Sequence, residues 1–150
     1  MPGLTLDNAL AIATAAFAAA RDRNAKPLCV VVLDNGGHVL VTHRHEAASL
    51  FRAAIATAKA TGSLGMGMGS RAIAARAQQS PAFFASLSSV TDGQIAMAPG
   101  GVLIRDSSGG IIGAVGISGD TSEIDEACAV SGIEAVGLMA DPGSAPEGRA

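Results

Sequence analysis

The sequence predicts an α+β domain, in which helices pack on a central antiparallel sheet. Two pairs of apolar runs are each joined by a short Gly-rich turn, at residues 34–37 and 106–110. Short turns of this kind join antiparallel strands rather than parallel ones. Segments with apolar residues at three- and four-residue spacing, which is typical of helices, precede, separate and follow these pairs. With no internal repeat or linker, we expect a single domain over residues 1–142 and a flexible tail over 143–150.

The first predicted helix begins near the N-terminus. Thr5 or Asp7 can cap it, and its apolar spacing continues to about Arg23, where polar residues end it. The first predicted hairpin, Leu28–Arg44, follows. The dipeptide Asn35-Gly36 lies between two β-favouring runs, which is a strong hairpin signal because both residues tolerate positive φ angles.

The central part of the chain is predicted to be helical with irregular connections. Ser49 can cap a second helix that ends at Gly62, with an apolar stripe of Leu50, Phe51, Ala54, Ile55 and Ala58. The Gly-rich segment 62–70 is predicted to be a loop, and two short helices over 70–79 and 81–89 follow it. Residues 94–97 are a candidate short strand.

A second hairpin and a last helix complete the predicted domain. Residues 102–105 and 111–118 form the strands, and strict alternation places Ile111 and Val115 on the face opposite Ile112. Gly in a strand interior often marks a close approach by another backbone or a ligand. Ser122 and Asp125 resemble a capping box at the start of the last helix. Its expected buried stripe is Ile124, Cys128, Ala135 and Met139.

Composition excludes some classes of function. The chain of 150 residues has a net charge of −3 and no Trp or Tyr, and it contains no basic block. Nucleic-acid binding is therefore not expected. No apolar run approaches the length of a membrane span, and the first residues do not resemble a signal peptide. We therefore expect a cytoplasmic protein with no membrane partner, in which Cys29 and Cys128 are buried and unpaired.

Three segments together indicate a family. They are VVVLDNGGHVLVTHR, SLFRAAIATAKA and PGGVLIRDSSGGIIGAVGISGDTSEIDEACAVSGIEA. The chain closely resembles the GlcG/HbpS-like (DUF336) family of small heme-binding proteins, which includes the C-terminal domain of PduO-type proteins. The most specific parts are the DNGGH turn and the GGxxxGAxGxSG pattern over Gly109–Gly119. The resemblance implies a profilin-like fold with about five strands, and homo-oligomers in which dimers assemble into rings or octamers.

The resemblance also implies a heme or tetrapyrrole ligand. Heme requires an iron ligand, an apolar pocket and cations for its propionates. In the heme-binding members a histidine of the N-terminal helix has been treated as a ligand, and this chain has none there. The candidate metal ligands in this chain are His43 and His45, which are two residues apart and share one face if the strand continues, and Met66 and Met68 are further candidates. Arginines are candidates for binding propionates or other carboxylates; they are Arg44, Arg52 and Arg71.

Other residues keep a second class of function open. His38 follows a tight turn, and Ser118-Gly119 precedes a helix start, where free N–H groups favour an anion. Gly100-Gly101 is the other candidate backbone site. Asp34 or His38 could combine with Arg44 and Arg52 in an acid–base site. The alternative to heme binding is therefore a cofactor-free accessory enzyme, an isomerase or lyase, or a binding protein for a small organic acid of a catabolic pathway.

Overall fold

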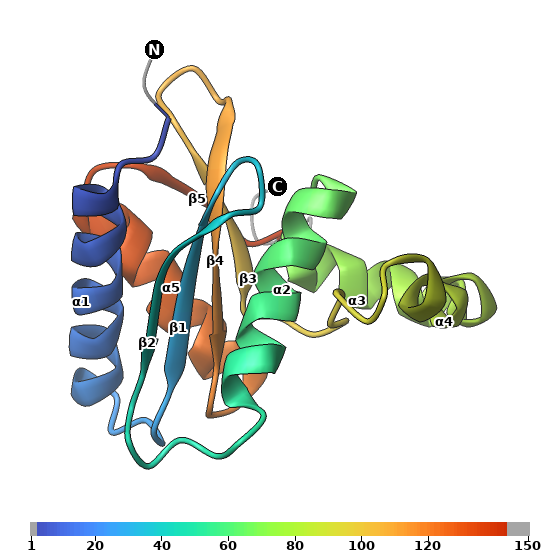
Figure 1. Cartoon of the computed structure of the whole chain (residues 1–150), viewed down its shortest axis with the longest axis horizontal. Helices are drawn as coiled ribbons and strands as arrows, with labels where there is room; N and C mark the ends of the chain where they lie inside the picture. The colour runs from blue at the N-terminus through green and yellow to red at the C-terminus, as the bar shows by residue number, and fades with distance from the viewer. Residues whose placement is uncertain (1–2, 144–150) are drawn as a thin grey trace.

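The computed structural model describes residues 3–143 and confirms the α+β prediction (Figure 1). A five-stranded antiparallel sheet has the strand order β2-β1-β4-β3-β5. In chain order the described elements are α1 (Leu6–Asp22), β1 (Cys29–Asp34), β2 (Val39–Arg44), α2 (Arg52–Met66), α3 (Ser70–Gln79), α4 (Pro81–Val90), β3 (Gly101–Arg105), β4 (Ile111–Ser118), α5 (Ser122–Ala135) and β5 (Met139–Asp141). Within residues 3–143, no helix is long and apolar enough to cross a membrane.

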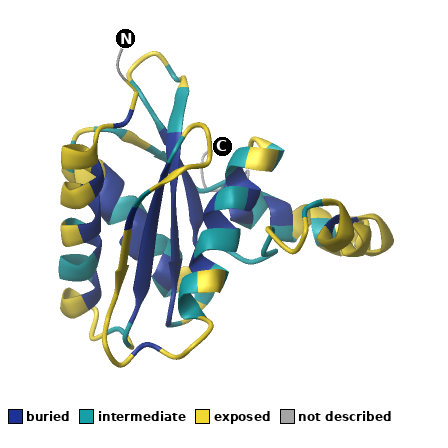
Figure 2. Cartoon of the chain, viewed as in Figure 1, coloured by how far each residue is buried: buried dark blue, intermediate teal, exposed yellow. Residues whose placement is uncertain are grey.

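The helices form two layers around the sheet and a projecting arm. Helices α1 and α5 cover one face, α2 covers the other, and α3 and α4 extend away from the sheet (Figure 1). The central strands β1 and β4 are the most deeply buried part of the molecule (Figure 2). Because β1 is covered on both faces, its residues form a continuous apolar run, CVVVL, rather than an alternating one.

The first helix and the first hairpin form where predicted, but the turn does not use positive φ angles at Asn35 and Gly36. The Thr5 hydroxyl oxygen accepts a hydrogen bond from the backbone N–H of Asn8 at 3.1 Å, which satisfies one of the free donors at the start of α1. Strands β1 and β2 pair as an antiparallel hairpin. In the turn, Gly37 is the residue that adopts a positive φ, 83°. The buried cysteines Cys29 and Cys128 are unpaired, as expected.

Helix α2 differs from its prediction in length and in buried face. It continues through Gly62 to Met66 and ends at Gly67, whose φ of 72° is typical of a helix end. Gly62 is required for contact rather than termination, because a Cβ there would lie 2.9 Å from the Ile95 side chain. The predicted cap and stripe were wrong, because the N-cap is Phe51 rather than Ser49, and Leu50 and Phe51 are exposed.

The buried residues of α2 are small or polar: Ala56, Lys59, Ala60, Gly62 and Ser63. Such residues allow the helix to lie very close to the sheet. A Cβ at Gly116 of β4 would clash with the backbone oxygen of Ala56, so this strand position accepts only glycine without a shift of the helix. The glycine in the GAxG pattern is thus explained by packing.

The other strand predictions need two corrections. Residues 94–97 are not a strand, and the fifth strand is β5, which pairs with β3 after the last helix. The pairing of β3 with β4 shifts at Arg105, and Ile112 consequently packs on the α1 side while Ile111 packs on the α2 side. Strict alternation had placed these two residues the other way round.

The N-cap of helix α5 lies one residue before the predicted Ser122. Thr121 is the N-cap, and its hydroxyl oxygen accepts from the N–H of Ile124. Asp125 is buried and makes a long-range ion pair instead of closing a capping box. Cys128 is buried as expected, but Ala135 is exposed and Met139 belongs to β5. Of the predicted tail, residues 144–150 lie outside the described part of the chain.

Candidate functional site

One end of the sheet collects most of the predicted site residues. Strand β1 begins there and strands β2 and β4 end there, since Val30 pairs with both His43 and Ile117. The residues at this end are His43, Arg44, His45, Arg52, Gly100, Gly101, Ser118 and Gly119. His38 lies at the opposite end, in the β1–β2 turn.

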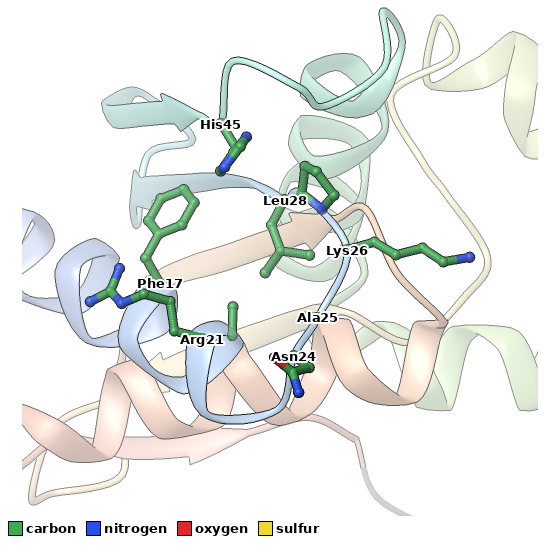
Figure 3. A pocket seen from close by; sticks show the side chains of 9 residues that line it. Phe17, Arg21, Asn24, Ala25, Lys26, Leu28 and His45 are labelled. Carbon is green, nitrogen blue, oxygen red and sulfur yellow. The ribbon is translucent and has the colours of Figure 1, made fainter.

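A pocket of about 490 Å³ lies at this end of the sheet, between the last turns of α1, the connection to β1 and the end of β2. Its size is within the range of small-molecule sites. The lining residues are Phe17, Ala20, Arg21, Asn24, Ala25, Lys26, Pro27, Leu28 and His45 (Figure 3). Of the predicted site residues, only His45 lines it.

The lining combines an apolar wall with positive charge. Phe17, Leu28 and Pro27 supply apolar surface, and Arg21 and Lys26 supply cationic groups. Among residues 3–143, the side chains of Arg21 and Lys26 make no ion pair with a carboxylate. The pocket can therefore take a ligand with an apolar body and negatively charged ends.

The His45 imidazole is held by its own loop. The backbone N–H of His45 donates to the Leu28 carbonyl oxygen at 2.9 Å, which extends the β1–β2 pairing by one residue. The Nδ1 atom accepts a hydrogen bond from the backbone N–H of Ala47 at 3.0 Å. The Glu46 carboxylate is 3.8 Å from Nδ1. Because Nδ1 accepts from the Ala47 N–H, it carries no proton that it could donate to Glu46. The neutral ring consequently carries its proton on Nε2.

Arg44 binds the same loop. One terminal nitrogen of its guanidinium donates to the carbonyl oxygens of His45, Glu46 and Ala48, at 3.1, 3.2 and 3.1 Å. These contacts hold the chain in place directly after β2. Arg44 does not line the pocket, so its clear structural role is to support the residue that does.

Arg52 and Ser118 lie together on the face of the sheet covered by α2, away from the pocket. The Arg52 guanidinium donates to the hydroxyl oxygens of Ser118 and Ser49, both at 3.1 Å. The sequence suggested both Arg52 and Ser118 as ligand-binding residues, and the structure brings them into contact with each other. Arg71, the third arginine, pairs with Glu126 at 2.9 Å on the α3–α5 side of the molecule.

The predicted backbone anion sites are filled by the protein's own atoms. At the start of α5, Asp125 accepts from the N–H of Asp120 at 2.9 Å and Thr121 caps the helix. A Cβ at Gly101 would clash with the backbone of Lys59, and a Cβ at Gly119 would clash with the Pro27 carbonyl oxygen. A Cβ at Gly100 would likewise meet the Lys59 side chain. Close packing therefore explains these glycines.

His38 belongs to an exposed turn. Its ring Nδ1 is 3.2 Å from the Asp34 carboxylate, which also accepts from the N–H groups of Gly36 and His38 at 2.9 and 3.0 Å. These hydrogen bonds, with that of the His38 N–H foremost, lower the pKa of Asp34 below its ordinary value. The side chain of His38 is 80% exposed, so the pair stabilises the turn without any enclosed space for a ligand.

The candidate metal ligands are not brought together as a site. His43 is on the sheet face shared with Val41, but it does not line the pocket. Met66 and Met68 pack against a small apolar cluster around Ile73 in the projecting arm. Within the part of the chain that the structure describes, no group of three or more His, Cys, Asp or Glu side chains could hold a metal ion.

Sequence reasoning missed the other half of the pocket. Phe17, Arg21 and Lys26 were assigned only to the end of the first helix and its connection. The signal that could have found them is register: this connection leads directly into β1, whose hairpin partner delivers His45 to the same end. Arg21, in the last turn of α1, consequently lines the same pocket as His45.

The fold and pocket define a class: a small α+β domain with a pocket at the end of its antiparallel sheet. The family model described as haem degrading protein HbpS-like matches residues 4–134, and the chain belongs to this family. A comparison with curated protein sequences gives no match.

Several solved structures are similar over most of the chain. PduOC in complex with heme is 26% identical, with a TM-score of 0.82, and the alignment covers 91% of this chain and 97% of that one. Klebsiella pneumoniae ORFY is 27% identical, with a TM-score of 0.80 over 89% and 90% of the two chains. A double mutant of Streptomyces reticuli HbpS is 26% identical, with a TM-score of 0.78 over 91% and 88%.

Proposed function

We propose that this protein binds heme or a related tetrapyrrole in the pocket between the end of α1 and His45. The observation that supports this most directly is the lining itself. The lining includes an apolar wall with Phe17 and Leu28, and two cationic residues, Arg21 and Lys26, that make no ion pair within residues 3–143. A tetrapyrrole has a flat apolar body and two carboxylates. Family membership and the similarity to the heme complex of PduOC give independent support.

The fit to heme has two parts. The apolar wall and the cations suit the macrocycle and its propionates. The donor set for iron does not fit in the same way, because the Nδ1 lone pair of His45 is already used by the Ala47 N–H. The proposal is therefore for binding of the tetrapyrrole, and no chemistry at the iron is assigned to this pocket.

The direct test is a hemin titration of the purified protein, followed by absorbance in the Soret region. We expect a saturable change with one site per chain. The matched variants are Arg21→Gln and Arg23→Gln. Both remove an exposed arginine at the end of α1, but only Arg21 lines the pocket. Loss of a hydrogen bond to a charged group should weaken binding on the order of tenfold in Arg21→Gln and leave Arg23→Gln unchanged.

Two results would contradict this proposal in different ways. A broad, unsaturating absorbance change with the wild-type protein would mean that it is not a tetrapyrrole binder. Saturable binding that is weakened by Arg23→Gln but not by Arg21→Gln would mean that the ligand binds elsewhere on the molecule.

A small organic acid is the second candidate ligand, and one observation favours it. N–H donors from Arg21, Lys26 and His45 are among the polar groups of the lining residues, and such donors recognise carboxylates with or without a metal. A thermal-shift screen of small carboxylates tests this candidate. Stabilisation by a carboxylate that is lost in Lys26→Gln, with no response to hemin, would favour it over the tetrapyrrole.

We also propose that the chain forms a homo-oligomer built from dimers, which can assemble further into an octamer. The most exposed of the large apolar side chains are Leu50 and Phe51, 85% and 69% exposed, and Phe83 and Val90 on α4, 58% and 78% exposed. Exposed apolar groups of this size often mark protein contacts. Sedimentation at micromolar concentration should show an oligomer, and a monomer would contradict the proposal.

A further inference from the structure

The strongest unexplained feature of the pocket is the bonding of its only histidine. We infer that His45 serves the ligand as a hydrogen-bond donor through Nε2–H, and that the pocket therefore binds metal-free tetrapyrroles as well as heme. This inference rests on the proposed function and concerns how the same pocket recognises its ligand. It differs from the sequence-based expectation that His45 is an iron ligand.

The tautomer follows from a donor whose proton is unambiguous. A backbone N–H can only donate, and Ala47 N lies 3.0 Å from His45 Nδ1, so Nδ1 must present a lone pair. A neutral imidazole has one proton, which is then on Nε2. The nitrogen left for the ligand is consequently a donor, and an N–H group cannot coordinate iron.

The loop resists the change that ligation would need. For Nε2 to gain a free lone pair, the proton must move to Nδ1, where it would face the Ala47 N–H. The alternative is to turn the ring or open the loop. The Arg44 guanidinium holds that loop through the carbonyl oxygens of His45, Glu46 and Ala48, and the His45 N–H is bonded to Leu28. Each route therefore breaks hydrogen bonds that the present arrangement satisfies.

The donor role fits the neighbouring groups. The lining residues include Arg21, Lys26 and Asn24 beside His45, and in Figure 3 the Lys26 side chain extends away from Phe17, Leu28 and His45. His45 and Arg21 carry N–H groups that recognise negative charge, so we expect the pocket to bind its ligand through the carboxylates and the flat apolar body. The iron would then add little to affinity.

The test compares hemin with protoporphyrin IX, the same macrocycle without metal. The chain has no Trp or Tyr, so the absorbance and fluorescence of the ligands themselves report binding without interference. We expect the two dissociation constants to agree within about threefold, a difference of roughly 0.7 kcal/mol. His45→Ala should weaken both ligands on the order of tenfold, since each loses the same hydrogen bond.

Two variants separate donation from ligation. His45→Gln places a carboxamide N–H near the position of Nε2–H, so it should restore binding of both ligands and leave the hemin spectrum unchanged. His43→Ala is the matched control, because it removes a nearby histidine, in β2, that does not line the pocket. It should change neither affinity nor spectrum.

Other outcomes would overturn the inference. Hemin binding that is more than about 100-fold tighter than protoporphyrin IX binding, with a Soret shift in His45→Gln, would show that His45 ligates iron. The same preference with the shift in His43→Ala would assign ligation to His43. Binding of neither ligand would contradict the proposed function itself, together with this inference.

Discussion

The buried pair of Lys59 and Asp125 is expected to be the most sensitive polar contact in the molecule. Lys59 is 4% exposed and Asp125 is 1% exposed, and their Nζ and Oδ2 atoms are 3.2 Å apart. Lys59 also donates to the Ile117 carbonyl oxygen at 2.8 Å, and Asp125 accepts from the Asp120 N–H. The pair thus connects α2, the end of β4 and the start of α5.

Replacing Lys59 with Met leaves the aspartate buried without its partner. Breaking a buried ion pair from one side costs about 3–5 kcal/mol, because the remaining charge is neither paired nor solvated. This is a large part of the roughly 5–15 kcal/mol by which a domain is stable. The double variant Lys59→Met with Asp125→Leu should recover part of the loss, since it leaves no buried charge.

The loss should depend on pH in a defined direction. Burial raises the pKa of Asp125, while the Asp120 N–H and Lys59 lower it. Without Lys59 this pKa rises further, so the carboxyl takes up a proton more readily in the folded state. A folded pKa above the unfolded value contributes stability at low pH that is lost as the pH rises through the folded pKa. The deficit of Lys59→Met should therefore be larger at pH 7 than at pH 4.

Urea unfolding of both variants at several pH values measures these quantities. Lys26→Met is the matched control, because Lys26 is exposed and the same substitution there should change the free energy of unfolding by only about 0.5 kcal/mol. A deficit below about 1 kcal/mol in Lys59→Met at neutral pH, or one that does not decrease on acidification, would refute the reasoning.

Three further predictions concern packing and acid stability. Gly116→Ala should reduce the free energy of unfolding by about 1–3 kcal/mol, because its Cβ would clash with Ala56; a neutral result in chemical denaturation would mean that α2 can shift. Gly65→Ala, also measured by denaturation, should stabilise by about 1 kcal/mol, because Gly65 is an exposed helical position with nothing near its Cβ; destabilisation would argue against an exposed helix there. Hydrogen bonds from the backbone N–H groups of Lys26 and Thr121 lower the pKa of the Asp120 carboxyl in the folded state. The ionised carboxylate therefore stabilises the fold above its ordinary pKa, and this stability is lost as the pH falls through the lower folded pKa. Asp120→Asn should therefore lose less stability than wild type between roughly pH 5 and pH 3 in urea unfolding, and an equally steep loss would contradict the assignment.

Some predictions that depended on local chemistry were confirmed, whereas the Ser49 cap was not. The cap at Thr5 and the two hairpins depend on residues close in sequence, whose backbone preferences act alike in any fold. Errors arose where a contact from elsewhere changed the role of a residue. Gly62 was predicted to end a helix, but it lies against Ile95. Asp125 was predicted to be a cap residue, but it pairs with Lys59, which is 66 positions away.

The sequence by itself determined the α+β class, the hairpin that carries the histidines and, through its motifs, the family. Those features are written in short patterns of apolar spacing, turn residues and glycines. Only the tertiary structure decided which polar residues share the pocket, since that depends on the register of β1 with β2 and on where α1 ends. It also decided the proton position on His45, because the Ala47 N–H that sets it is oriented by the fold of the loop and not by the residue type.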